Sequence, residues 1–572
     1  MNDRRPLFAV ALILLIAIIP GILMKKPAPR PTATAATLAE PQRPTQDSGV
    51  AGVQPPASLR AFPGSSDTTL PPEKTVVVRS GLYRYAISTY GARIVSSRFL
   101  HYSSMVAGDT TAAGKRDTLE LIRTGDALLA TRLLVGSDTV RLDRVAFTAS
   151  ADSVTVGNAP ATVTLTGTAA GRDVSLSYHF MPDDYRITVD GKVSGLGTAG
   201  GTLLIGMGGS LRLTEANPAD NLRESGIVTK SDKTRLTRFG QLKPLSTTSI
   251  EGPFEWVALK SKYFVVGLFA YDSLSANNIT GRIGGVVATV PDTFKTPVRA
   301  ETAASLTVPA GGTFHWALYV GPMEYNRLKA AGRDFDDVNP YGWAWLRPVI
   351  RPLAVMLRAL FVWMHHTLGL GYGLVIVAFG ILMRVVLWPL NSKAYRSMAA
   401  MQAIQPQITA LQARYKDDPA RLQQETLVIY RENKVNPLSG CWPMLIPYPL
   451  LVAVYFVLAS TIEVRGVSFL WLTDLSRADP FYIVPLIMAG SMFVLSKIGQ
   501  MGMPPNPQAK MMMYMMPGMM LVLFARFASG LNLYYAVQNI ASLPQQWMIM
   551  KERKRIMDAK TGPVVVSTRK PR

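Results

Sequence analysis

The stretch GLVIVAFGILMRVVLWPL, residues 373–390, decides how the rest of the chain is interpreted. Counted from about Leu370, it supplies the roughly 20 apolar residues that a membrane-spanning helix needs. Arg384 lies inside it, about two-thirds of the way along. An arginine at the centre of a span costs roughly 2.5–3.5 kcal/mol on insertion scales. Such a residue either faces a bundle interior or a hydrated cavity, or lies close enough to the interface to reach the headgroups. Its position alone favours neither interpretation.

The composition predicts a membrane protein of several domains, without metal or covalent chemistry. The chain has 572 residues and a net charge of +22, which points to cytoplasmic loops and anionic lipid first, and to RNA or ribosomes next. Its one cysteine, Cys441, excludes an internal disulfide and a thiolate metal cluster. The five histidines form no zinc-type spacing, and no phosphate loop or GxSxG elbow is found. We therefore predict no catalytic residue, no metal ligand and no cofactor.

The amino-terminal region predicts an anchor followed by a linker. Residues 1–24 run mostly apolar from Leu7 to Leu23 and lack a small-residue cleavage site before Lys25. We therefore expect an uncleaved membrane anchor, with a cleaved signal peptide as the alternative. Residues 25–74 contain ten prolines and a single aromatic residue, Phe62. Such a composition does not bury enough surface to fold, so this region is predicted to be a linker.

Residues 75–335 predict a large all-β domain. Segments 161–166, 173–178 and 185–189 alternate apolar and polar residues, and Gly, Asn and Asp turns separate such runs. This alternation is typical of half-buried antiparallel strands. About 250 residues in one all-β unit indicate a large sandwich. The domain is interpreted as a scaffold because no acid/base pair stands out, and a binding or sugar-active module is the alternative.

Two helical regions flank the span that contains Arg384. In residues 340–366, Leu353, Leu357, Leu360 and Met364 recur at helical spacing, and arginines occupy another side, which predicts an amphipathic helix on the membrane surface. Residues 391–437 predict a helical hairpin in which Asp418 caps the second helix. The hairpin has seven basic residues against four acidic ones, so the positive-inside rule places it in the cytoplasm. Its basic residues include Lys393, Arg396, Arg414, Lys416 and Arg421.

Four further apolar segments complete a core at residues 370–550. They are predicted as spans at 441–460, 481–498, 511–527 and 531–550. The tail, residues 551–572, has eight basic residues against two acidic ones, which indicates a cytoplasmic carboxyl end. Counting back gives six spans with both termini in the cytoplasm, and places the β domain on the outer side.

The last span has a polar stripe. At about 100° per residue, spacings of 3, 4, 3 and 4 put these polar side chains on one face of the helix. A polar stripe in a membrane needs a partner or water, and so does an arginine. Helix–helix hydrogen bonding is the alternative for the stripe alone. Stripe and arginine together favour one hydrophilic cavity. The stripe comprises Asn532, Tyr535, Asn539, Ser542 and Gln546.

Several of these features together resemble the YidC-type bacterial membrane protein insertases of the Oxa/Alb superfamily. They are Arg384 in its span, the basic hairpin, Lys434-Val435-Asn436-Pro437-Leu438 with Gly440-Cys441, and Ser529-Gly530-Leu531 before Tyr534-Tyr535. Tyr341-Gly342-Trp343 and Tyr319-Val320-Gly321-Pro322 resemble the stretches that lead into the family's core. The resemblance covers nearly the whole chain, most strongly 340–550.

The resemblance implies a five-helix core with an amino-terminal anchor and a periplasmic β-supersandwich in the bacterial inner membrane. It implies a groove open to the cytoplasm and the lipid but closed to the outside, in which Arg384 attracts acidic residues of an incoming segment. The partners implied are nascent membrane proteins, with the ribosome, the Sec translocon and anionic lipids as further candidates. The chain is then an insertase and chaperone, not an enzyme.

Two other functions remain open on the sequence. A secondary transporter would also carry a charged site inside the membrane, although the inverted repeats typical of transporters are not seen. A carbohydrate enzyme in the β domain would require a histidine and a carboxylate side by side in a pocket. His179 and His315 are the candidates for that pair.

Overall fold

The computed structural model describes residues 73–111, 115–271, 282–342, 345–389, 391–392, 404–416, 418–433, 447–501 and 507–560. The predicted anchor, nearly all of the linker, the motif at 434–441 and the tail beyond 560 lie outside these residues. So do Lys393 and Arg396 of the predicted hairpin.

The strands within residues 75–322 form three mainly antiparallel sheets. Together with the short helices α3 and η3 that follow them, these sheets form what we call the β domain, residues 75–338. The five-stranded sheet has the order β4 (Thr118–Glu120), β3 (Arg93–Ser103), β2 (Tyr83–Ser88), β1 (Thr75–Arg79), β8 (Ser153–Thr155). The six-stranded sheet has the order β15 (Thr247–Phe254), β18 (Ile283–Thr289), β19 (Glu301–Val308), β12 (Gly201–Gly208), β5 (Thr131–Val135), β6 (Asp138–Val140).

The third sheet has nine strands. Its order is β14 (Thr234–Arg238), β13 (Gly226–Lys230), β16 (Trp256–Lys260), β17 (Phe264–Tyr271), β20 (Thr313–Pro322), β11 (Arg186–Val193), β10 (Arg172–Phe180), β9 (Ala161–Ala169), β7 (Thr148–Ala149). The predicted alternation is confirmed, because in β10 every second side chain from Val174 to Phe180 is buried. Short elements connect the strands: η1 (Leu142–Arg144), α2 (Pro218–Glu224), η2 (Phe239–Gln241), α3 (Tyr325–Ala330) and η3 (Phe335–Val338).

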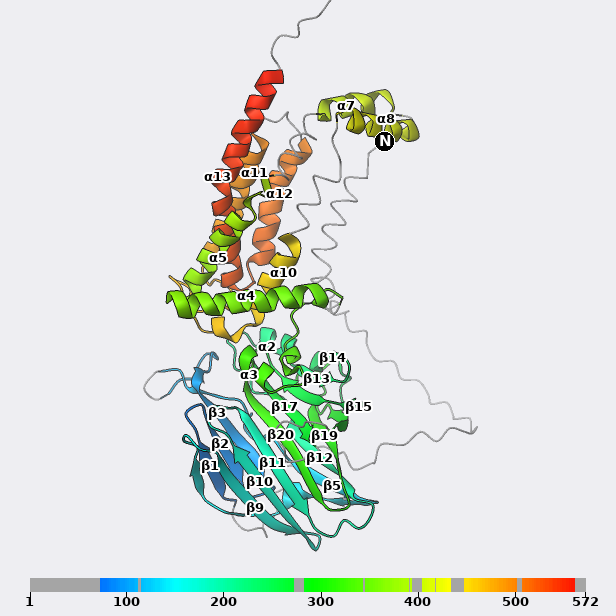
Figure 1. Cartoon of the computed structure of the whole chain (residues 1–572), viewed down its shortest axis with the longest axis vertical. Coiled ribbons are helices and arrows are strands. Elements are labelled where there is room, and N and C mark those ends of the chain that lie inside the picture. The colour runs from blue at the N-terminus through cyan, green and yellow to red at the C-terminus, as the bar shows by residue number, and fades with distance from the viewer. Residues whose placement is uncertain are drawn as a thin grey trace, which may run out of the picture. The chain divides into compact units, whose positions relative to one another are not determined.

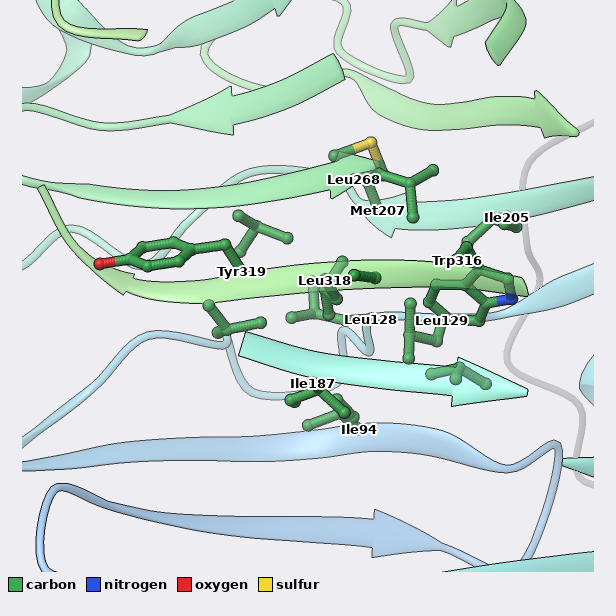
Figure 2. Close-up of a cluster of buried hydrophobic side chains, with 14 of the residues drawn as sticks. Ile94, Leu128, Leu129, Ile187, Ile205, Met207, Leu268, Trp316, Leu318 and Tyr319 are labelled. Atoms are coloured by element: carbon green, nitrogen blue, oxygen red, sulfur yellow. The ribbon is translucent and has the colours of Figure 1, made fainter. Parts of the chain in front are cut away.

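One hydrophobic core joins the three sheets. Figure 2 shows part of it, in which Trp316 and Leu318 of β20 lie among side chains of the neighbouring sheets. Ile94 belongs to the five-stranded sheet, and Ile205 and Met207 belong to the six-stranded one. Because side chains from opposite sheets share a single buried cluster, the predicted sandwich is confirmed.

The remaining described residues are helical. The elements are α4 (Arg347–Leu368), α5 (Tyr372–Val386), α7 (Gln405–Arg414), α8 (Pro419–Glu432), α10 (Pro447–Ser460), η5 (Ile462–Val464), α11 (Ile483–Gln500), α12 (Pro507–Phe524) and α13 (Ser529–Lys560). Helix α13 packs against α5 and α11, and α4 packs against α10. In Figure 1, α5, α11, α12 and α13 run side by side, whereas α4 lies across them.

By length and hydropathy, two of the described helices are able to cross a membrane, Arg347–Leu368 and Ile483–Gln500. Three shorter apolar helices are Tyr372–Val386, Tyr448–Ser460 and Ala509–Phe524. Because α4 lies across the bundle, its length alone does not make it a span. The six-span topology therefore stays a prediction.

Two local predictions have clear outcomes. The Asp418 carboxylate accepts the backbone N–H of Arg421 at 3.0 Å, so the predicted cap of α8 is confirmed. Two arginines of α4 bind carboxylates of the protein instead of facing lipid headgroups. Arg351 pairs with Asp336 at 2.8 Å and with Asp337 at 3.0 Å, and Arg358 is buried against Glu463. These two arginines hold α4 to the rest of the chain.

Candidate functional site

Arg384 lies in the last turn of α5, where the helix faces α13. Its side chain is buried, with 8 % of the residue exposed. The guanidinium Nη2 donates a hydrogen bond to Oε1 of Gln545 at 2.5 Å. Of the two sequence interpretations, the structure favours a position inside the bundle over one at the headgroups, since a snorkelling side chain would be exposed.

Gln545 forms hydrogen bonds with residues at and after the carboxyl end of α5. It is 1 % exposed, and its Nε2 donates to the carbonyl oxygen of Trp388 at 3.1 Å and to the hydroxyl of Ser392 at 2.9 Å. One amide therefore accepts from the arginine and donates to the chain that follows α5. An amide that uses both ends in this way fixes its own orientation, and so the position of the cation beside it.

The charge on Arg384 is balanced less completely than that of the other buried cations. Among the described residues, five further lysines and arginines are buried, and each has a carboxylate within 4 Å: Arg132, Lys230, Lys260, Arg358 and Arg465. Within the same residues Arg384 has an amide as its partner, and its Nε has none. A buried cation without a carboxylate is costly unless water or an anion reaches it.

The predicted stripe faces α11 and α12. The side chain of Asn532 donates to the carbonyl of Phe524 at 3.0 Å, and that of Asn539 donates to the carbonyl of Met488 at 3.4 Å. The hydroxyl of Ser542 bonds within α13, to the Gln538 carbonyl.

Two members of the stripe make close packing contacts. Tyr535 packs edge-on against Phe524 with ring centroids 5.2 Å apart, and Gln546 lies against Gly499. Helix–helix bonding thus accounts for much of the stripe.

The stripe and the residue that binds Arg384 lie on neighbouring faces of α13. Gln545 precedes Gln546 by one residue, which is a rotation of about 100°. Among the described residues, Arg384 bonds to Gln545 and to none of the five stripe side chains. Both faces nevertheless contain buried polar atoms without a partner there, namely Arg384 Nε, Asn532 Oδ1 and Gln546 Oε1. Such atoms are rare unless water or a ligand satisfies them.

Sequence reasoning did not single out Gln545. Its signal was the pair Gln545-Gln546 in an apolar helix, of which the periodic pattern selected only the second. Because α13 is polar on more than one face, the 3.6-residue period does not identify the face toward α5.

The hairpin presents its basic residues to solvent. Arg414 and Arg421 lie over the ring of Tyr415, at 5.7 and 5.5 Å from its centroid, and Lys416 is exposed. These cations are therefore free to meet an acidic surface.

The β domain does contain a histidine–carboxylate pair. Asp190 of β11 lies between His179 of β10, at 2.8 Å, and His315 of β20, at 2.6 Å. Thr162 Oγ1 bonds to the other ring nitrogen of His179 at 2.9 Å. The side chains are partly exposed and bond to one another across four strands, as expected of a polar sheet face.

Two family models match this chain. The one described as 60Kd inner membrane protein matches residues 363–556, and the one described as YidC periplasmic domain matches residues 75–355. Proteins named membrane protein insertase YidC are also similar to it. That of Chlorobaculum tepidum is 32 % identical over 544 residues, covering 88 % of this chain and 86 % of its own length. That of Pelodictyon phaeoclathratiforme is 30 % identical over 575 residues, covering 96 % and 95 %.

A solved structure described as an active YidC insertase with its first transmembrane domain resolved aligns over 84 % of this chain and 93 % of its own. Its identity of 18 % and TM-score of 0.34 are too low to add to the argument. The sequence matches suffice, and none of them supports the transporter hypothesis. The chain belongs to the YidC family of bacterial membrane protein insertases, and its β domain is the periplasmic domain of that family.

Proposed function

We propose that this insertase passes newly made membrane proteins through a hydrated groove beside α5 and α13, where Arg384 attracts acidic residues of the incoming segment. The observation that carries the proposal is the charge balance of the bundle. Among the described residues, Arg384 is the buried cation whose partner is an amide and not a carboxylate. A carboxylate from a substrate supplies what the site lacks.

Electrostatics makes this attraction effective inside the membrane. Two unit charges 4 Å apart interact by about 4 kcal/mol at an effective dielectric constant near 20, against about 1 kcal/mol in water. The gain offsets part of the cost of moving an acidic tail away from bulk water. A hydrated groove also shortens the hydrocarbon path that a polar segment has to cross. The process needs positioning and solvation and no covalent step, so the protein acts as an insertase and not as an enzyme.

Methionines of α12 supply a wall suited to many substrates. Met511, Met512 and Met515 are exposed on that helix. Their side chains are flexible and polarisable, so they adapt to apolar segments of different shape. Ordinary contact with lipid is the alternative role for the same residues.

The charge distribution supports the proposed topology and the contacts with the ribosome or anionic lipid, whereas nascent chains and the Sec translocon are partners that the family resemblance implies. The hairpin and the tail are basic, which favours six spans with both termini in the cytoplasm. Exposed cations at Arg414, Lys416 and Arg421 then face the ribosome or anionic lipid, and nascent chains arrive from the ribosome directly or through the Sec translocon. The predicted anchor at 1–24 and linker at 25–74 tether the periplasmic domain in this arrangement.

The test uses purified full-length protein in liposomes and a single-span substrate with a short translocated tail. Two substrates differ only in whether the tail is acidic or neutral, and insertion is read as protection of the tail from added protease. We expect Arg384→Ala and Arg384→Glu to reduce protection of the acidic tail and to leave the neutral tail nearly unchanged. Arg526→Ala is the matched control, because this arginine is exposed beyond the end of α12. Equal loss for both tails would overturn the role of Arg384 as countercharge.

A further inference from the structure

A short segment between α10 and α11 packs against both the β domain and the helical bundle. Ile462 of η5 belongs to the hydrophobic core of the β domain, whereas Val464, two residues later, belongs to the core of the helical bundle. Between them, Glu463 pairs with Arg358 of α4. Three consecutive residues thus contact the β domain, α4 and the bundle.

Arg465 makes the polar contacts of this segment with the β domain. Its side chain is 2 % exposed, and its Nε donates to Glu215 Oε1 at 2.8 Å. Its Nη1 and Nη2 donate to the carbonyl oxygens of Ser103 and Thr214, both at 3.1 Å. The guanidinium also lies over the Phe264 ring, 5.4 Å from its centroid. We call Ser103, Met105, Thr214, Glu215 and Phe264 the socket.

Gly466 completes the fit. It has a φ of +71°, and a Cβ at this position would lie 2.4 Å from the terminal carbon of Met105. The positive φ favours glycine here, because other residues rarely adopt this backbone conformation, whereas the contact with Met105 involves only the flexible end of that side chain. Arg465 and Gly466 therefore fit into the socket through several buried contacts. An ion pair on the surface, in contrast, leaves its two side chains free to move.

The rest of this connection covers helix ends. The carbonyl oxygens of Leu475 and Arg477 accept the backbone N–H groups of Gly530 and Ser529, at the start of α13. Phe469 packs on Gly373 near the start of α5. We call residues 461–482 the cap.

The cap also fixes the start of α11. Asp479 accepts the backbone N–H of Val484 at 2.7 Å. The cap follows α10 and contacts the first residues of α5, α11 and α13.

We propose that the β domain seats the cap through the socket, and that the seated cap closes the periplasmic end of the groove to ions while segments are inserted. The closing role rests on the groove proposed above, whereas the seating of the cap does not. Removing Glu215 leaves a buried cation with backbone carbonyls as its remaining acceptors, which is strongly destabilising at such a site. Glu215 and Ser103 belong to the β domain and Arg465 belongs to the cap. Removing Glu215 therefore weakens the contact between the cap and the β domain, and we expect the strands to stay folded.

The seating is measured by hydrogen exchange on the full-length protein in detergent. We expect Glu215→Ala to raise exchange rates across 463–477 by about tenfold or more, while β10 and β20 stay protected. Glu215→Gln keeps an oxygen acceptor for Arg465 and should show a smaller rise. Gly466→Ala tests the insert independently, with Gly490→Ala as its control, since nothing lies within 4 Å of a Cβ at Gly490. Unchanged exchange in the cap of a folded Glu215→Ala protein would overturn the seating.

The closing role is measured by passive potassium efflux from proteoliposomes that contain no substrate. We expect efflux to rise severalfold in Glu215→Ala and Gly466→Ala, and to stay at the wild-type rate in Gly490→Ala. A loosened cap without added efflux would overturn the seal. The countercharge role of Arg384 is tested separately, by the insertion assay with Arg384→Ala. The seal and the countercharge role can therefore be refuted independently of each other.

Discussion

Gln545→Glu tests the countercharge argument with almost no change in shape. The new carboxylate keeps an oxygen in the place of Oε1, 2.5 Å from the guanidinium of Arg384. The amide donor to the Trp388 carbonyl and to the Ser392 hydroxyl is lost, and Ser392 is able to turn its own hydroxyl toward the carboxylate. Arg384 then has an internal counterion, as the other buried cations have.

The expected size of the effect follows from this geometry. An ion pair at 4 Å is worth about 4 kcal/mol at an effective dielectric constant near 20, as an upper bound before desolvation is subtracted. If about 1.4 kcal/mol of this attraction survives for an incoming carboxylate, blocking it lowers insertion of an acidic tail about tenfold. A neutral tail does not use this attraction, so its insertion should stay near the wild-type level.

The assay is protease protection in proteoliposomes with the matched acidic and neutral tails. Gln545→Met is the paired control, because it removes the hydrogen bond to Arg384 without supplying a charge. It should lower stability and yet preserve the preference for acidic tails. If a folded Gln545→Glu protein inserts acidic tails as well as the wild type does, then Arg384 does not act as a countercharge and the reasoning is refuted.

Three further predictions concern stability, each measured as the thermal unfolding of the full chain in detergent. Glu463→Ala should cost about 3–5 kcal/mol, because it leaves Arg358 buried without its carboxylate. Gly267→Ala should cost about 1–3 kcal/mol through overpacking, because its Cβ would lie 2.3 Å from the ring of Phe335. Burial lowers the pKa of Lys260 below its ordinary value of 10.5. Between the folded and the unfolded pKa values, the unfolded chain binds more protons than the folded one, so the free energy of unfolding rises with pH. Lys260→Met should remove this rise.

The first two of these predictions each have a matched control variant. Asp220→Ala breaks the exposed pair with Arg223 and should change stability by no more than about 1 kcal/mol. Gly157→Ala places a Cβ where nothing lies within 4 Å. A loss in the controls equal to that in the test variants would contradict the burial argument. For Lys260, a Lys260→Met protein with the pH profile of the wild type would contradict the lowered pKa.

Local pattern was enough for the fold class, a β sandwich joined to a helical core. Alternation in 161–189 predicted three neighbouring strands because the side chains of a strand alternate between its faces. Apolar length predicted the helices of the core, and Asp418 before Pro419 predicted where α8 begins. These features depend on residues a few positions apart, so a single sequence contains them. The boundaries were less accurate, since the span predicted at 511–527 is a helix from Pro507 to Phe524.

The partners of the buried charges were decided by the tertiary structure. Arg384 meets Gln545 161 residues away, and Arg465 meets Glu215 250 residues away. Pairs of this kind depend on how each helix is rotated about its axis and on which loop reaches which sheet edge, and no local period encodes either. For the same reason the sequence identified Arg384 and the stripe as polar residues that need partners, whereas only packing showed that Arg384 meets a face of α13 next to the stripe. The sequence by itself determined which side chains require a polar environment, and the fold determined which atoms supply it.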